Sequence, residues 1–560
     1  MICIRIHTNH SKCIIMQYMT KRLNIFIFGL FFYDRLREKI EDGEKMIKFG
    51  KGVVKCRFLI LILAFLLLIP SAIGYMKTRI NYDILSYLPG QIETMKGQDI
   101  LLDEFGTGAF SFVVVEGMQD KDLQKIADKI EDVPHVKNVI WYGSIMDFSI
   151  PREALPDDIY NFFNNKDADS QLMAVLFDES MSSDGTMDAI QTINDLVGKQ
   201  CFVSGMASVN NDIRKLAENE SVIYVLIAVV LSLIVLSLTM DSVVVPFLFL
   251  ISIGMAIIYN LGSNVFFGEI SYITKALAAV LQLGVTMDYS IFLWHSYQEQ
   301  KERFDGDKNR AMAHAISNTF TSVTSSSITT IAGFAALCFM TFKLGMDLGL
   351  VMAKGVIIGV LCCVTILPAM ILIFDKPIEK TKHKPLIKSM DKVSAFITKH
   401  YKVWIVAFLI LLIPAIYGNN HTKIYYNIAQ SLPQSLPSNV ANSELKDDFD
   451  MSTMHIVMLD KDMDAKEKKA MMSEIDDVKG VKWTLGLNSI VGSSIPESMI
   501  PDDVKSMLQG KDTELMFVCT KYESATPQVN KQIKQIDKIV KSYDKSGMVI
   551  GEAPLMKDLQ

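Results

Sequence analysis

The chain has 560 residues, half of them hydrophobic, and a formal net charge of −6. This length and apolar content predict a multi-domain protein with a large membrane part. The small net charge and the lack of a long basic run exclude a typical nucleic-acid-binding protein. The eight cysteines follow no disulfide or zinc spacing, so we expect no metal site.

The first 45 residues have no clear role. Their apolar run, residues 23–33, is too short to span a bilayer. No small-residue cleavage site follows it, which argues against a signal peptide. We therefore expect residues 1–45 to be an over-extended start and assign them no function. Residues 46–75 are predicted to be a basic cytoplasmic lead-in followed by the first membrane helix.

Seven apolar stretches are predicted to cross the membrane. Positive charges precede the first stretch, and a lysine-rich segment at residues 375–402 precedes the last. By the positive-inside rule both lie in the cytoplasm, which predicts a multi-pass plasma-membrane protein with a cytoplasmic N-terminus. The predicted spans are residues 58–75, 222–240, 243–261, 274–294, 320–340, 348–374 and 403–418.

Two polar domains, residues 76–218 and 419–560, are expected on the extracytoplasmic side. In the first, residues 110–116 and 172–177 are β-rich, whereas 122–130 and 187–197 have helical periodicity. Strands that alternate with helices predict an α+β domain of the ferredoxin-like, split βαβ kind.

The second part of the chain repeats the first. The motif L-L-L-I-P-S-A-I-G at residues 66–74 returns as I-L-L-I-P-A-I-Y-G at 410–418, and S-I-x-x-x-S-I-P-x-x-x-x-P-D-D occurs at 144–158 and 489–503. The offset stays near 345 residues. Such a duplication is a known device of transporters. In this alignment Gln560 matches Arg214, so the second half is incomplete and five more helices are expected to follow.

Asp288 is the most unusual residue of the fourth span. A carboxylate deep in a bilayer costs about 2.5–3.5 kcal/mol on insertion scales, so it usually marks an ion pathway. The predicted spans contain no arginine, and Lys275 lies about 20 Å along the same helix. We therefore favour a proton-carrying role for Asp288 over a fixed ion pair.

Several motifs together resemble the MMPL-type (mycobacterial membrane protein large) branch of the resistance–nodulation–division superfamily. They are G-V-T-M-D-Y-S-I-F-L at 284–293, R-A-M-A-H-A at 310–315, T-S-S-S-I-T-T-I-A-G-F at 324–334 and L-P-A at 367–369. The resemblance implies an exporter of hydrophobic or amphiphilic molecules that uses the proton gradient and no other cofactor. It also implies that the polar domains are porter domains and that Asp288 and Tyr289 form the proton-relay pair of the fourth helix.

Other residues near this pair are candidates for relay or packing support. Gly284 lies one turn before Asp288 and would let another backbone approach. Ser322, Ser326 and Thr329 share one face of the next span and could present hydroxyls, although such hydroxyls often bond their own backbone. Lys354 is expected to extend toward the outer interface, with a transient ion pair to Asp288 as the less favoured role. Trp294, where the fourth span is predicted to end, suits an interfacial anchor.

The sequence therefore predicts a transporter rather than an enzyme, because no phosphate-binding loop or catalytic constellation is present. Two alternatives stay open: a lipid- or sterol-sensing receptor that moves no proton, and an accessory factor for export of lipids or polypeptides. The expected partners are the lipid bilayer, an amphiphilic or lipid substrate, and either further copies of the chain or accessory proteins.

Overall fold

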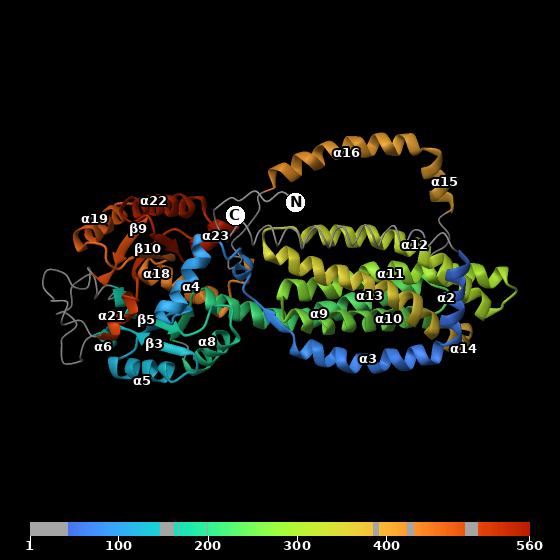
Figure 1. Ribbon diagram of the computed structural model, residues 1–560, viewed down its shortest axis with the longest axis horizontal. Helices are drawn as coiled ribbons and strands as arrows, with labels where there is room; N and C mark the ends of the chain where they lie inside the picture. Colours follow the sequence, from blue (N-terminus) through green and yellow to red (C-terminus); the bar gives the residue numbers. More distant parts are fainter. Residues whose placement is uncertain are drawn as a thin grey trace, which may run out of the picture. The chain divides into compact units, whose positions relative to one another are not determined.

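The computed structural model describes residues 43–145, 162–165, 167–198, 200–384, 391–422, 431–487 and 502–560. These form two compact units (Figure 1). The membrane unit contains the described residues up to Asn81 and residues 219–421. The α+β unit contains residues 82–218 and 422–560. Nearly all of the predicted N-terminal extension and most of the repeated S-I-x-x-x-S-I-P motif lie outside the described residues.

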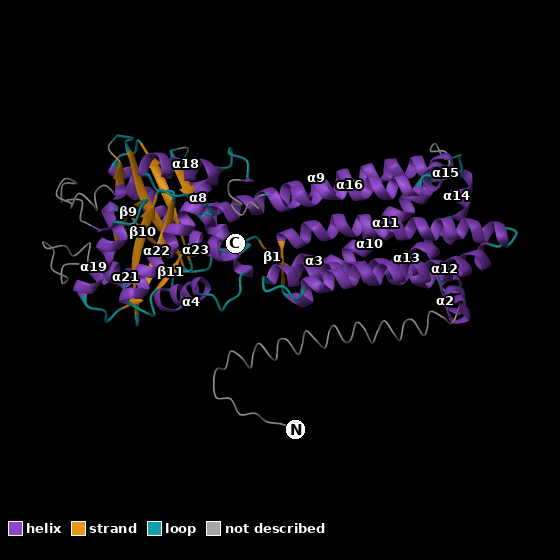
Figure 2. Ribbon diagram, turned by 90° about the horizontal axis from the view of Figure 1, so that it is seen from above, coloured by secondary structure: helices purple, strands orange, loops and turns teal. Residues whose placement is uncertain are grey.

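Within the described residues, seven helices are long and apolar enough to cross a membrane, which confirms the predicted polytopic helical protein (Figure 2). Each one contains most of a span predicted from the sequence. They are α3 (Arg57–Lys77), α9 (Met206–Thr239), α10 (Val244–Gly262), α11 (Tyr272–Arg303), α12 (Lys308–Leu337), α13 (Lys343–Ile373) and α16 (Tyr401–His421).

Shorter elements connect these helices. Strand β1 (Arg79–Asn81) pairs in parallel with β7 (Glu269–Ser271), and Arg79 forms an ion pair of 2.8 Å with Glu269. The remaining elements of the membrane unit are α2 (Gly43–Lys55), the 3-10 turn η3 (Ser263–Phe267), α14 (Asp375–Lys380) and α15 (Asp391–Lys399).

The turn between α11 and α12 is shorter than predicted, because both helices extend into the charged stretch between the two spans. Asp307 ends the turn by accepting hydrogen bonds from the backbone N–H groups of Asn309 and Arg310. Trp294 therefore does not end its helix. It is 2% exposed and donates to Asp241 Oδ1 at 3.0 Å, so the prediction that the helix ends here was wrong and Trp294 packs against protein.

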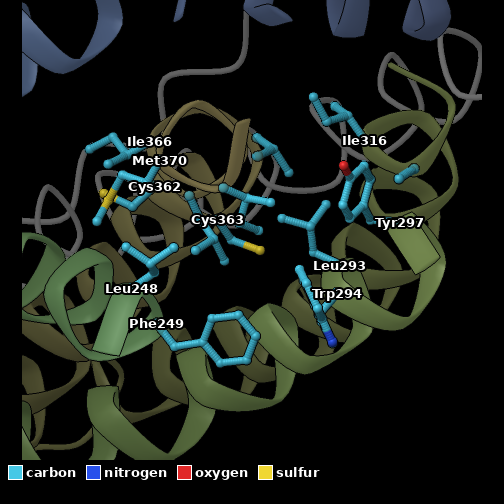
Figure 3. Close-up of a cluster of buried hydrophobic side chains, with 14 of the residues drawn as sticks. Leu248, Phe249, Leu293, Trp294, Tyr297, Ile316, Cys362, Cys363, Ile366 and Met370 are labelled. Atoms are coloured by element: carbon cyan, nitrogen blue, oxygen red, sulfur yellow. The ribbon is translucent and has the colours of Figure 1, made fainter. Parts of the chain in front are cut away.

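The core of the membrane unit lies among α10, α11, α12 and α13. Phe249, Leu293, Tyr297, Ile316 and Cys363 pack together there (Figure 3). In contrast, α16 has no buried residue, and most of the apolar side chains of α9 beyond Val222 are exposed. Exposed apolar side chains on membrane helices suit contact with lipid.

The α+β unit contains two antiparallel sheets with the same strand order. The first has the order β3-β5-β2-β6, and the second β9-β10-β8-β11. Their strands are β2 (Ala109–Glu116), β3 (Val136–Ile140), β5 (Ser170–Phe177), β6 (Cys201–Ser204), β8 (Thr453–Asp460), β9 (Val481–Leu485), β10 (Thr513–Thr520) and β11 (Met548–Ile550), and β4 (Asn164–Asn165) pairs with the edge of β5.

Each sheet carries two helices on one face, in a split βαβ order. In the first, α5 (Asp120–Glu131) follows β2 and α8 (Asp184–Leu196) follows β5, and their buried side chains form one core with the strands. In the second, α19 (Ala465–Asp476) and α22 (Pro527–Tyr543) occupy the matching places. The remaining elements are η1 (Leu85–Tyr87), α4 (Glu93–Phe105), α6 (Tyr142–Ile145), α18 (Pro437–Phe449), α21 (Asp502–Leu508) and α23 (Glu552–Leu559).

The helix that precedes each sheet packs against the other sheet. Leu101 and Phe105 of α4 pack on Ile456 and Met458 of the second sheet, whereas Leu445 of α18 packs on the first. A Cβ on Gly97 would lie 2.4 Å from Ile550, so only glycine allows α4 to lie this close. This exchange of helices holds the two α+β halves together as one unit.

Candidate functional site

Asp288 lies on an exposed face of α11. Its neighbours on that face, one or two turns away, include Leu281, Gly284 and Phe292, which are also exposed. Among the described residues, Asp288 has neither an ion pair nor a side-chain hydrogen bond. A carboxylate within an otherwise apolar face of a membrane helix needs cover by protein or water, because contact with hydrocarbon would leave its charge unsolvated.

Tyr289 points to a different side of the same helix. It is 4% exposed and belongs to the hydrophobic core of the membrane unit. Adjacent helical residues differ by about 100° in direction, which explains this separation. The proposed relay pair therefore connects an open face of α11 with the packed interior.

Gly284 is exposed, and no described atom lies within 4 Å of a Cβ placed on it. The described part of the chain thus gives this glycine no packing partner. Gly333 of α12 is equally open. These two positions leave room for a close neighbour on the exposed faces of α11 and α12.

The hydroxyls of α12 divide into two groups. Thr329 donates to the carbonyl of Ser325 at 3.4 Å, as expected for a helical hydroxyl that bonds one turn back. Ser322 and Ser326 are exposed, and neither side chain has a hydrogen bond in the part of the chain that the structure describes. Only these two of the three predicted hydroxyls are thus available to another group.

Lys354 is partly buried, and its side chain reaches from α13 to the end of α10. Its Nζ donates to the backbone carbonyl of Asn260 at 3.0 Å and to the side-chain oxygen of Asn264, and it lies 4.8 Å from the ring of Phe267. All three partners lie at the end of α10 or in η3. Lys354 thus links α13 to α10 through several contacts.

A buried polar network that we did not predict continues from these contacts. Asn260 donates to Gln282 Oε1 at 3.0 Å, and Gln282 donates to the carbonyl of Gly355 at 3.2 Å. A Cβ on Gly355 would lie 2.5 Å from Asn260 Nδ2, so the network requires glycine there. The sequence contains a signal for this network, because polar residues interrupt otherwise apolar runs in α10 and α11.

Asp347 forms a separate polar contact between α13 and the start of α11. It accepts hydrogen bonds from the backbone N–H of Ser271 at 2.9 Å and from the hydroxyl of Thr274 at 2.6 Å. Both hydrogen bonds reach Oδ2 of Asp347, and they fix α13 to α11. This contrasts with Asp288, which has no such partner among the described residues.

The α+β unit contains a cavity of about 520 Å³. Polar side chains line one part of it, including the ion pair of Lys446 with Glu523 at 2.7 Å. Burial raises the pKa of Glu552, another lining residue. A second cavity of about 120 Å³ has an almost wholly apolar, phenylalanine-rich lining, and Phe110, Phe112 and Met454 line both cavities.

A metal site has weak support. Within the described residues, one group of three acids (Glu116, Glu444 and Asp448) brings its carboxylate oxygens within 4.8 Å of one another. Burial and the neighbouring carboxylates raise the pKa of Glu444. We assign no metal to this group.

Residues 95–398 match the model of the MMPL family. The chain belongs to the MMPL family. The matched region includes α11, α12 and α13, and with them Asp288, both free serines and Lys354. The membership confirms the resemblance to the resistance–nodulation–division superfamily that the motifs of α11 and α12 indicated.

Three relatives show how similar the sequence is and how much of each chain the similarity covers. The apo-petrobactin exporter of Bacillus anthracis is 22% identical over 70% of this chain and 59% of its own length. The siderophore exporter MmpL5 of Mycobacterium tuberculosis is 22% identical over 58% of this chain and 35% of its own length. The putative membrane protein ActII-3 of Streptomyces coelicolor is 30% identical over 27% of this chain and 22% of its own length. The chain thus spans less than two thirds of the length of these relatives.

Proposed function

We propose that this MMPL-family protein is a transporter, not an enzyme, that exports a hydrophobic or amphiphilic molecule in exchange for protons. Asp288 takes up and releases the proton. One observation carries this proposal: the carboxylate lies on an open face of a membrane helix, whereas Asp347 is bonded in place. Two relatives named as exporters support the direction of transport.

Asp288 and Tyr289 have different roles in the proposed relay. When Asp288 binds a proton, its charge disappears and the cost of contact with apolar surroundings falls. The face of α11 that surrounds it can then pack differently against its neighbours. Because Tyr289 is fixed in the core, a rotation of α11 moves the packed helices as well. Ser322 and Ser326 supply free hydroxyls to water or to Asp288 during this step.

The α+β unit is proposed to be the extracytoplasmic porter part, formed by the duplicated domains. Its two cavities suit an amphiphile: the phenylalanine-rich cavity takes an apolar chain, and the larger cavity takes a polar group near Lys446 and Glu523. The excess of lysine in residues 375–402 supports a cytoplasmic location for that segment in the plasma membrane, with the N-terminus on the same side.

The proposal is tested by efflux of the fluorescent amphiphile N-phenylnaphthylamine from cells that express the full-length protein. We expect a protonophore or Asp288→Asn to reduce efflux to the level of cells without the protein. Asp305→Asn is the matched control, because Asp305 lies in the exposed turn between α11 and α12 and loses the same charge. Efflux that persists with Asp288→Asn would contradict the proposal.

A lipid-sensing receptor is the alternative from another class. It predicts stable binding of an amphiphile with no flux that depends on the proton gradient. Phe112→Ala, which enlarges both cavities, is expected to weaken N-phenylnaphthylamine binding in either case. Only a transporter loses efflux in the presence of the protonophore, so the two measurements together separate the alternatives.

A further inference from the structure

A basic pocket lies at the end of the membrane unit where α2, α3 and α12 meet. Its volume is about 670 Å³, and it is separate from Asp288 and from the cavities of the α+β unit. Lys51 and Lys55 of α2, Arg57 of α3 and Arg310 of α12 all line it, and no acidic residue does. Four cations from three helices thus converge on one pocket.

These four cations have no acidic partner within the described residues. Arg57 donates to the side chain of Asn309 at 3.0 Å, and the guanidinium of Arg310 lies 4.4 Å from the ring centre of Phe304. Both contacts orient a guanidinium without neutralising it. Asp307, the acid closest in sequence, accepts backbone N–H groups at the start of α12. The pocket therefore keeps an excess of positive charge.

The position of α2 is fixed by close packing. A Cβ on Gly50 would lie 2.5 Å from the backbone oxygen of Ala313, so the two helices touch at glycine. Val53 and Val54 are buried in the core of the membrane unit. Lys51 and Lys55 lie beside these residues on α2 and are consequently held at the pocket, which Val54 also lines.

Apolar side chains of α3 continue from the pocket along the membrane span. Phe58 lines the pocket itself, and Phe58, Leu59 and Ile62 are each more than 60% exposed. A ligand with an anionic head and apolar chains matches both parts of this surface. Guanidinium and ammonium groups are the usual partners of phosphate, and basic pockets between membrane helices on the cytoplasmic side bind anionic lipid headgroups.

We propose that Lys51, Lys55, Arg57 and Arg310 bind the phosphate of an anionic phospholipid in the cytoplasmic leaflet. The lipid chains lie along the exposed start of α3. The bound lipid connects α2 to α12, the helix that carries Ser322 and Ser326. This inference rests on the membrane orientation of the proposed function but not on proton coupling.

The test is a titration of the full chain in neutral detergent with dioctanoyl phosphatidylglycerol, followed by native mass spectrometry. The pocket variant is Lys51→Gln/Lys55→Gln/Arg310→Gln. The control is Lys392→Gln/Lys399→Gln/Lys402→Gln, which removes the same charge from exposed positions of α15 and near the start of α16. The pocket variant is expected to bind the lipid on the order of 100-fold more weakly, and the control close to wild type.

Binding measurements with two other ligands and with a single variant identify the ligand and keep the proposal falsifiable. Dioctanoyl phosphatidylcholine is expected to bind weakly, and glycerol 3-phosphate to compete poorly. The proposal would be overturned if the pocket variant bound phosphatidylglycerol as tightly as the control variant does. It would also be overturned if phosphatidylcholine or glycerol 3-phosphate bound as tightly as phosphatidylglycerol. If the triple variant does not fold, Lys51→Gln alone should lose about fivefold in affinity, and no loss would overturn the proposal. Since no transport is needed, failure here is distinct from failure of the Asp288 efflux test.

Discussion

Asp288 and Tyr289 are adjacent in sequence but lie on different sides of α11: the carboxylate is on an exposed face, and the phenol ring is 4% exposed in the core. This separation places a titratable group and a packing anchor on consecutive residues. A change in the charge of Asp288 thus acts on α11, whose position is fixed by the buried ring of Tyr289. The predictions below test the residues around this pair.

Ser326→Ala is expected to slow proton-coupled efflux severalfold, because it removes a hydroxyl that has no partner among the described residues. Ser325→Ala is the matched control, since Ser325 is also exposed but donates to the carbonyl of Thr321 at 3.0 Å. Efflux of N-phenylnaphthylamine measures both. Equal loss of efflux in the two variants would show that the free hydroxyl has no special role.

Lys354→Met is expected to destabilise the membrane unit by about 1–3 kcal/mol, because it leaves two acceptors, one at the end of α10 and one in η3, without their donor. Thermal unfolding in detergent measures this loss. Lys343→Met, at an exposed lysine of the same helix, should have little effect. Normal stability together with lost efflux would instead place Lys354 in the proton path.

Gly355→Ala is expected to disrupt the contact between α10 and α13, because its Cβ would come within 2.5 Å of Asn260 Nδ2 and 3.1 Å of Gln282 Oε1. A cost of roughly 1–3 kcal/mol follows from overpacking. Gly254→Ala, in α10, has open space around its Cβ and serves as control. Equal melting temperatures for the two variants would contradict the network described above.

Asp83 is expected to make the stability of the α+β unit depend on pH. Burial raises its pKa from 3.8 to about 6, although the N–H groups of Leu85 and Ser86 lower it. The folded state holds this proton more tightly than the unfolded chain, so stability falls as pH rises from about 4 to 6 and stays lower above that range.

Asp83→Asn should therefore stabilise the protein at pH 7–8 by roughly 3 kcal/mol and have little effect near pH 4. The side-chain oxygen that accepts from the Leu85 N–H at 2.9 Å is retained in this variant. Thermal unfolding across this pH range measures the difference, with Asp99→Asn on the exposed face of α4 as control. A difference that does not change with pH would contradict the assignment to Asp83.

Hydropathy and strand periodicity predicted much of the local structure. The seven spans follow from long apolar runs, and the run predicted as a strand at residues 110–116 is β2 (Ala109–Glu116). These features depend on neighbouring residues alone, which is why one sequence suffices to find them.

The exchange of α4 and α18 could not be predicted in the same way. The buried residues Leu101 and Phe105 suit either sheet as far as the sequence shows, and the choice depends on close contacts such as Gly97 with Ile550. The buried network of Asn260, Gln282 and Gly355 also required knowledge of which helix faces meet. Asp288 became a candidate from sequence alone because a carboxylate is unusual at its position, whatever its neighbours; its role stays a prediction.

Proton movement through the full-length protein in liposomes tests the central claim most directly. A pH-sensitive dye inside the liposomes reports proton flux when N-phenylnaphthylamine is added. We predict amphiphile-dependent flux for the wild type, reduced flux for Asp288→Glu, and none for Asp288→Asn, which keeps the shape of the side chain but cannot release a proton in the same way. Wild-type flux through Asp288→Asn would contradict the claim that Asp288 carries the proton.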